Sequence, residues 1–263
     1  MRRLCAIALA LTMLGCSSAE QTGAPSRTGA ADGAFRSVAA GGRHSCGLRT
    51  NDTITCWGDN SDGQADPPAG TFRAITAGWD YSCGLRTDNT ITCWGDSPVA
   101  GTPHGGTFRA VTAGGRHSCG LRTDNTIECW GKSFDGQADP PSGTFRAVTA
   151  GGDRSCGLRT DNTIECWGRD FSGLATPPGT FRAVTAGSCA LRTDDTIECW
   201  GSNLYGAADP PGGAFRAITA GGSHLCGFRT VYTILWWVFP SFHGRVGLFV
   251  RVTHRQHHRM LGQ

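Results

Sequence analysis

Pairs of cysteines ten residues apart recur along this chain, and their spacing could serve metal binding, redox chemistry or covalent cross-linking. A representative stretch is RHSCGLRTDNTIECWG, residues 116–131, in which His117 stands two residues before Cys119, and Cys129 completes the pair. Tetrahedral zinc sites favour cysteines two to four residues apart, and no fourth ligand is evident. A catalytic cysteine needs a matched histidine and a third orienting group. A structural disulfide is therefore the leading interpretation, zinc is the minor alternative, and no cofactor is predicted.

A repeated unit carries these cysteines and must position them. The motif Phe-Arg-[Ala/Ser]-[Val/Ile] begins at Phe35, Phe72, Phe108, Phe145, Phe181 and Phe215. This period of 34 to 37 residues is typical of solenoids and propellers. The pieces FRAVTAG, HSCGLRT and TIECWG are rich in strand-forming residues, and no segment shows the 3.6-residue period of a helix. The sequence therefore predicts an all-β fold with one repeat per blade.

The hairpin inside each unit has a definite expected register. If Cys119 lies opposite Cys129, then Leu121 lies opposite Ile127 and a three-residue loop remains between the strands. Such loops commonly end in a residue with left-handed backbone, which Asn and Asp tolerate. The predicted left-handed residues of the five complete units are all Asn or Asp: Asp52, Asn89, Asn125, Asn162 and Asp195.

This register places apolar side chains on both faces of the ribbon. Cys119, Leu121 and Ile127 share one face, and Trp130 points to the other. A sheet that is apolar on both faces must be covered on both, which blades stacked radially achieve. We therefore expect a β-propeller of small four-stranded blades, in which the segment GQADPP supplies a short fourth strand.

The unit AGGRHSCGLRTDNTIECWGKSFDGQ resembles the regulator of chromosome condensation repeat, whose pattern includes A-G-x-x-H-[ST]-x-[AG]-L and W-G-x-N-x-x-G-Q. Its short period and its GQADPP segment are similar to bacterial, exported members, including α-tubulin-suppressor-like repeat proteins and secreted propellers that inhibit β-lactamases. The resemblance implies a β-propeller over residues 35–238 with six legible blades, and a seventh blade is left open. It does not specify a function, because propellers host many activities.

The two ends of the chain lie outside the repeats. Residues 1–15 combine Arg2 and Arg3 with an apolar run, as an export signal does. The following MLGCSS resembles a lipoprotein signal, which implies cleavage before Cys16 and acylation of that cysteine; ordinary secretion is the alternative. Residues 16–34 have the composition of a flexible tether. Residues 239–263 diverge from the repeat, as an out-of-register C-terminal tail would.

An exported chain meets an oxidising environment, in which opposed hairpin cysteines form disulfides. The predicted pairs are Cys46–Cys56, Cys83–Cys93, Cys119–Cys129, Cys156–Cys166 and Cys189–Cys199. Cys226 is predicted to stay outside these pairs, because Trp236 stands where the sixth unit would have its second cysteine.

Sequence differences between the units concentrate in two segments, the turn AGGRHS and the loop after Trp-Gly. The expected chain directions place both segments at the same end of every blade. Aromatic and Arg side chains gathered there are typical of binding hot spots. The candidate ligand-binding face comprises Arg43, His44, Trp79, Asp80, Tyr81, Arg116, His117, Phe134, Asp170, Phe171 and Tyr205. Drift in solvent-exposed loops is the alternative explanation.

Charge argues against nucleic acid as a partner. Residues 35–238 carry 17 Lys and Arg against 19 Asp and Glu, so the repeats lack a basic footprint. No phosphate loop, nucleophile elbow or catalytic carboxylate pair is visible. The leading hypothesis is a non-catalytic module, anchored in the bacterial envelope by lipid or secreted, that binds a protein or glycan. A propeller lyase or hydrolase with a central-channel site, and a truncated non-functional copy, remain as alternatives.

Overall fold

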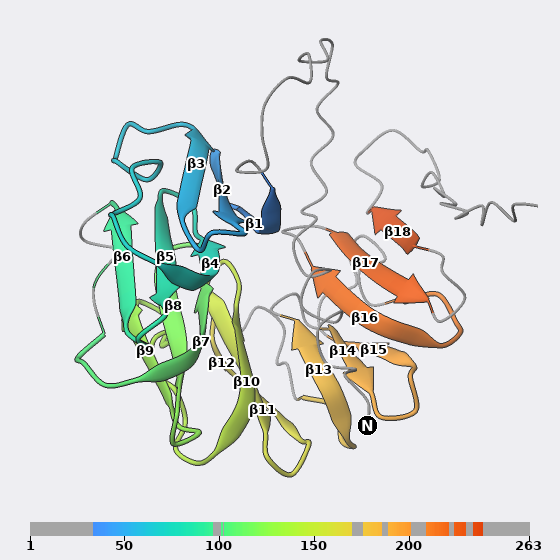
Figure 1. Ribbon diagram of the computed structural model, residues 1–263. Coiled ribbons are helices and arrows are strands. Elements are labelled where there is room, and N and C mark those ends of the chain that lie inside the picture. The colour runs from blue at the N-terminus through green and yellow to red at the C-terminus, as the bar shows by residue number, and fades with distance from the viewer. Residues whose placement is uncertain are drawn as a thin grey trace, which may run out of the picture.

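The computed structural model of this protein describes residues 34–96, 101, 103–169, 176–185, 189–200, 209–220, 224–229 and 234–238 (Figure 1). These residues form strands joined by turns and loops. Among them there is no helix with the length and apolar character needed to cross a membrane. The predicted signal, the acylation site Cys16 and the C-terminal tail lie outside the described residues.

The described residues contain eighteen strands, which form six antiparallel sheets of three strands each, and each sheet corresponds to one sequence repeat. The first sheet contains β1 (Phe35–Ala40), β2 (His44–Arg49) and β3 (Ile54–Gly58); the second β4 (Phe72–Ala77), β5 (Tyr81–Arg86) and β6 (Ile91–Gly95); the third β7 (Phe108–Ala113), β8 (His117–Arg122) and β9 (Ile127–Gly131); the fourth β10 (Phe145–Ala150), β11 (Arg154–Arg159) and β12 (Ile164–Gly168); the fifth β13 (Phe181–Thr185), β14 (Cys189–Arg192) and β15 (Ile197–Cys199); and the sixth β16 (Phe215–Ala220), β17 (His224–Arg229) and β18 (Ile234–Val238). In each sheet the second strand lies in the middle.

The hairpin register is the one that the sequence predicts. In the third sheet Cys119 pairs with Cys129 and Leu121 pairs with Ile127, and the other complete units repeat this arrangement. The predicted left-handed residues all have positive φ, between 67° at Asp52 and 74° at Asn125. The preceding Asp or Asn stabilises the turn, since the Asp124 carboxylate accepts hydrogen bonds from the Thr126 amide at 2.9 Å and from its hydroxyl at 2.7 Å.

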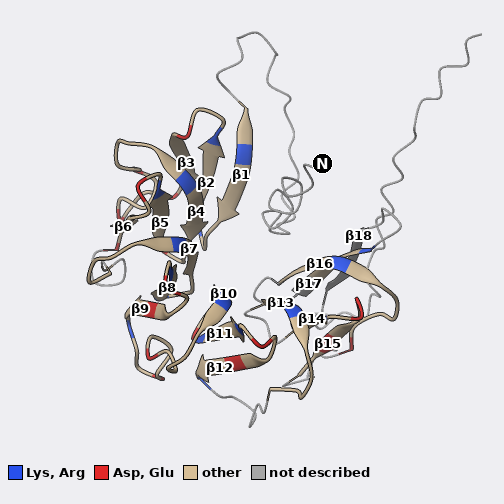
Figure 2. Ribbon diagram, turned by 60° about the horizontal axis from the view of Figure 1, so that its bottom comes forward, with Lys and Arg blue, Asp and Glu red and all other residues tan. Residues whose placement is uncertain are grey.

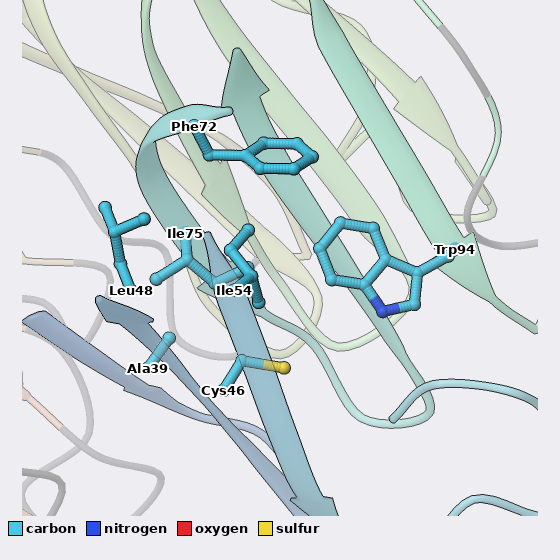
Figure 3. Packing of buried hydrophobic residues seen from close by; sticks show 7 residues of the cluster. All are labelled: Ala39, Cys46, Leu48, Ile54, Phe72, Ile75 and Trp94. Atoms are coloured by element: carbon cyan, nitrogen blue, oxygen red, sulfur yellow. The ribbon is translucent and has the colours of Figure 1, made fainter. Parts of the chain in front are cut away.

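Consecutive sheets pack face to face around a common centre, and their first strands contact one another (Figures 1 and 2). We call the face with the Cys, Leu and Ile side chains the leading face and the face with Phe and Trp the trailing face. The core between the first two sheets joins a leading to a trailing face (Figure 3), and its buried members are Ala39, Cys46, Leu48, Ile54, Phe72, Ile75 and Trp94. The next sheets repeat this arrangement. The core of the molecule is therefore divided into layers between neighbouring sheets, which explains why each sheet is apolar on both faces.

The predicted fourth strand is wrong for the first and third units, whose connecting loops are described. Residues 59–71 and 132–144 form turns and irregular structure instead of a strand. Gln64 and Gln137 are buried in these loops, and each side-chain oxygen accepts a hydrogen bond from the amide two residues earlier, at 2.8 Å. The main-chain oxygen of Gln64 accepts a hydrogen bond from the Trp94 indole at 3.0 Å. These hydrogen bonds anchor the loop without a fourth strand. Its two prolines lack the N–H groups that such a strand would need to pair with its neighbour.

Candidate binding face

In the first four units, whose turns are described, the two variable segments of each unit meet at one end of the sheet, as the sequence predicts. The amide that follows the third strand donates a hydrogen bond to the first turn of the same unit. Asp59 donates to the Arg43 oxygen at 3.0 Å, Asp96 to Asp80 at 2.9 Å and Lys132 to Arg116 at 2.9 Å. We call the end formed by these turns and loops the turn face.

Main-chain hydrogen bonds between sheets hold the turns of this face together. Gly42 donates its amide to the Gly78 oxygen at 3.0 Å, and Trp79 donates to the Gly115 oxygen at 3.2 Å. Gly115 in turn donates to the Gly151 oxygen at 2.8 Å. Four consecutive turns are therefore linked by backbone contacts, which makes this part of the turn face a pre-organised surface.

Trp79 is the large aromatic residue of this linked surface. Its side chain is 44% exposed, although it also lies across the next turn, where a Cβ on Gly115 would come within 3.0 Å of the indole. The Arg116 guanidinium lies over the indole, with its central carbon 5.6 Å from the ring centroid. Other units have glycine at the position of Trp79, for example Gly42 and Gly115, so the fold does not require an aromatic side chain there.

Charged and apolar groups flank this Trp–Arg pair. Arg43 is highly exposed, and its guanidinium lies 3.9 Å from the Asp59 carboxylate. Arg169 and Asp153 form a second pair at 3.4 Å. Phe134, in the loop that begins beside Arg116, is 83% exposed. The surface thus offers both aromatic and charged contacts to a ligand.

Three predicted members of the face are buried between sheets and are not available at its surface. His44 and His117 are 3% and 0% exposed, and each donates or accepts one hydrogen bond with a serine hydroxyl of the next sheet, Ser82 at 2.7 Å and Ser155 at 2.8 Å. Tyr81 is also fully buried, and it donates its phenolic hydrogen bond to the main-chain oxygen of His117. These side chains join neighbouring sheets. The prediction that they belong to the exposed candidate face is therefore wrong.

Burial sets the protonation of these groups. Desolvation lowers the pKa of His117 to about 4, against a smaller opposing effect of Asp153. The pKa of His44 is lowered for the same reason. Burial raises the pKa of Tyr81. Both imidazoles are therefore neutral at neutral pH.

The remaining predicted residues divide into two groups. Arg43, Trp79, Arg116 and Phe134 are exposed on the turn face, and Asp80 is partly exposed there. Asp170, Phe171 and Tyr205 lie outside the described residues.

The cysteines form cross-links instead of a metal or catalytic centre. All five predicted disulfides are present, each joining directly opposed residues of a hairpin. In the sixth sheet Cys226 faces Trp236 across the hairpin, as the sequence indicates. Several disulfides in one chain indicate an oxidising, extracytoplasmic environment. Within the described part of the chain, no three His, Cys, Asp or Glu side chains are grouped so that they could hold a metal ion.

Comparison with known families agrees with this geometry. The family model of the regulator of chromosome condensation (RCC1) repeat matches residues 35–64, 72–98 and 108–137. The chain contains RCC1 repeats. The matched segments coincide with the first three sheets, and the fourth to sixth sheets repeat the same strand order and register.

Solved structures show the fold that these RCC1 repeats build. The CRINKLY WD40 ectodomain of the Arabidopsis thaliana receptor kinase ACR4 is 26% identical, with a TM-score of 0.66 over 79% of this chain and 81% of that chain. Prp20p from Saccharomyces cerevisiae, studied for its binding to Gsp1p and histones, is 14% identical, with a TM-score of 0.62 over 77% and 71%. Yeast RCC1 (Prp20) bound to Kap60 is 15% identical, with a TM-score of 0.63 over 83% and 74%. The chain is therefore a β-propeller with six legible blades. No curated protein sequence matches it significantly.

The RCC1 repeats of this chain also contain two arginines whose roles the sequence did not reveal. The first arginine reaches the next sheet, where Arg109 donates a hydrogen bond to the main-chain oxygen of Phe145 at 2.8 Å. The second covers an aromatic ring of its own sheet, with the Arg122 guanidinium carbon 5.0 Å from the Phe108 centroid. The Arg122 guanidinium also pairs with the Glu128 carboxylate. These arginine contacts with carbonyl groups and aromatic rings depend on how the sheets are arranged, so the sequence pattern did not predict them.

Proposed function

We propose that this protein is an exported binding module that presents the turn face of its propeller to a protein or glycan partner. One observation carries the proposal: Trp79 exposes 44% of its side chain on a surface where equivalent positions hold glycine. An aromatic side chain that the fold does not need, on a rigid surface, has the properties of a binding residue.

The chemistry around Trp79 suits a partner with both apolar and polar groups. An indole offers a flat apolar surface together with an N–H donor, which serves protein side chains and the C–H faces of sugars alike. Arg116 beside it supplies a guanidinium, and Arg43 and Asp153 add charges of both signs. Because the turns are already linked by backbone hydrogen bonds, binding would cost little conformational entropy at these positions.

The location in our proposal is the bacterial envelope. Five disulfides support export, and the MLGCSS sequence supports acylation of Cys16, followed by the tether of residues 16–34. The similar ACR4 domain is itself a receptor ectodomain, and the yeast propellers have protein partners. These likenesses support a binding role and do not identify the partner of this chain.

A binding screen with matched variants tests the proposal. The mature chain is immobilised and exposed to purified envelope proteins and to a glycan array, and every ligand found is remeasured with Trp79→Gly and Arg116→Ala. We expect at least a tenfold weaker affinity, since aromatic and Arg hot spots contribute about 2 kcal/mol or more. Asp88→Asn is the control, because it lies in the hairpin loop at the opposite end and Asn51 makes the same turn contacts in the first unit. Ligands that bind all variants equally would place the binding site elsewhere.

A further inference from the structure

Two charged positions recur in the first four units of the turn face. One lies in the first turn and the other directly follows the third strand, and a main-chain hydrogen bond joins them in each unit. In the first unit these residues are Arg43 and Asp59, whose charged groups lie 3.9 Å apart. In the fourth unit they are Asp153 and Arg169, at 3.4 Å. The first and fourth units therefore neutralise their own charges at these positions.

The second and third units instead hold like charges at the same two positions. The second unit has Asp80 and Asp96, and the third has Arg116 and Lys132. In the part of the chain that the structure describes, none of these four side chains forms an ion pair. Two neighbouring units of the turn face thus present uncompensated charges of opposite sign.

Trp79 lies at the boundary between these two units. It belongs to the second unit and directly precedes Asp80, yet its amide donates a hydrogen bond to the Gly115 oxygen of the third unit at 3.2 Å. Its indole lies under the Arg116 guanidinium, whose central carbon is 5.6 Å from the ring centroid. Phe134, 83% exposed, adds a second aromatic ring in the loop of the third unit. An exposed apolar side chain therefore separates an acidic pair from a basic pair.

We infer from this order of groups that the partner bound at the turn face is a protein, an inference that rests on the function proposed above. The docking segment of the partner places a basic group over Asp80 and Asp96, an apolar side chain against Trp79, and an acidic group over Arg116 and Lys132. Complementary charges arranged in this way fix the orientation of a partner and disfavour others. A short protein segment carries both signs of charge and an apolar group, whereas most glycans have no cationic group.

A charge exchange at constant net charge tests this order. In the exchanged variant the two acidic residues become lysine and the two basic residues become aspartate: Asp80→Lys, Asp96→Lys, Arg116→Asp and Lys132→Asp. Non-specific attraction by the overall charge is thereby unchanged. The matched control, Arg43→Asp with Asp59→Arg, exchanges the charges within a unit that neutralises itself. Thermal unfolding of both variants verifies that the fold is retained.

The probe is a phage-displayed library of random short peptides, selected on the mature parent chain. Selected peptides are synthesised, and their affinities are measured by fluorescence polarisation. We expect the peptides that lose binding to Trp79→Gly to carry an acidic and a basic residue on opposite sides of an apolar residue. The exchanged variant should bind them at least about tenfold more weakly, and exchange of the charges within the peptide should restore the affinity. The control variant should bind them as the parent does.

The outcomes separate this inference from the proposed function. Peptides that depend on Trp79 but bind the parent and the exchanged variant equally would overturn the charge order and leave the turn face as the binding site. Peptides that bind Trp79→Gly as well as they bind the parent would contradict both the proposed function and the inference. A library that yields no binding peptide, beside a glycan that binds the parent and is lost with Trp79→Gly, would reject a protein as the partner. A library that yields no peptide and no such glycan would also reject it.

Discussion

Ile91, in the outer strand of the second sheet, lies against Gly120, in the middle strand of the third sheet. A Cβ on Gly120 would come within 3.1 Å of the Ile91 Cδ1 atom and within 2.6 Å of the Phe108 ring. Gly84 and Gly157 occupy equivalent places below Phe72 and Phe145. The glycine of the HSCGLR motif is therefore a packing requirement between neighbouring sheets.

Substitution of this glycine should weaken the contact between the sheets. We expect Gly120→Ala to lower the free energy of unfolding by about 1–3 kcal/mol, since the added methyl group overpacks a filled core. Chemical denaturation of the variant and the parent measures the change. The fifth sheet carries Ala190 at this position in a shortened unit, so Ala190→Gly provides the reverse comparison and should cost less than Gly120→Ala. If Gly120→Ala left the free energy of unfolding unchanged, the neighbouring sheets could make room for the methyl group, and the glycine would not be required for packing.

The left-handed residue of each hairpin loop also makes a contact with the next unit. Asn125, with φ of 74°, accepts a hydrogen bond at its main-chain oxygen from the Phe145 amide at 2.7 Å. Asn125→Val should destabilise the protein by about 1–2 kcal/mol, because a β-branched residue resists this conformation. Asn125→Gly should be close to neutral. The comparison of the two variants by thermal unfolding separates backbone strain from loss of the asparagine side chain, and equal losses would indicate a side-chain role.

Lowering the pH from 6.5 to 4 should destabilise the protein. In this range His117 stays neutral in the folded chain but becomes protonated in the unfolded chain. The folded pKa is about 4 and the unfolded pKa is near 6.5, so between these values the unfolded chain binds a proton that the folded chain does not. Stability therefore falls as the pH decreases from 6.5 to 4, by at most about 1.4 kcal/mol per pH unit for this group.

The variant His117→Gln tests this assignment, because it keeps a hydrogen-bonding side chain near Ser155 and removes the titration. Its free energy of unfolding should depend less steeply on pH between 4 and 6.5 than that of the parent. The residual slope includes His44, whose pKa is also lowered. Parallel curves for the two proteins would mean that His117 does not titrate in this range.

The hairpin disulfides should each contribute measurably to stability. We expect the double substitution Cys119→Ser and Cys129→Ser to lower the free energy of unfolding by about 2–3 kcal/mol under oxidising conditions. The main reason is that the unfolded chain, without the cross-link, has more conformational entropy. Under reducing conditions the double variant and the parent should converge. Peptide mapping of the parent, purified under oxidising conditions and without reductant, should recover residues 119 and 129 as one linked pair, and free thiols there would contradict the disulfide assignment.

Replacing Arg109 should lower the stability of the protein more than replacing an ordinary surface arginine does. Its guanidinium donates to the Phe145 carbonyl of the next sheet, so Arg109→Met should remove about 1 kcal/mol or more of stability while keeping much of the packing. The variant Arg116→Met, on the turn face, should change stability by less than about 0.5 kcal/mol. Denaturation midpoints of the two variants measure the difference.

Local patterns in the sequence determined the hairpins of this protein. The opposed cysteines set the register, the Asn and Asp residues fixed the loop conformation, and the alternation of apolar residues assigned the two faces. These features depend on residues close together in the chain, whose spacing restricts them to one arrangement. The repetition of the unit then indicated a stack of sheets, and the shared end of the turns followed from the strand directions.

Only the tertiary structure decided which side chains of that end are exposed. His44, Tyr81 and His117 occupy turn-proximal positions like those of Trp79 and Arg116, yet they point between sheets, where a serine or a main-chain oxygen of the next unit receives them. The same holds for the arginine contacts with the next sheet and for the connecting loops, which bury a glutamine instead of forming a strand. In each case the partner is about 30 to 38 residues away, and the sequence pattern of one unit carries no information on which groups of its neighbour it meets.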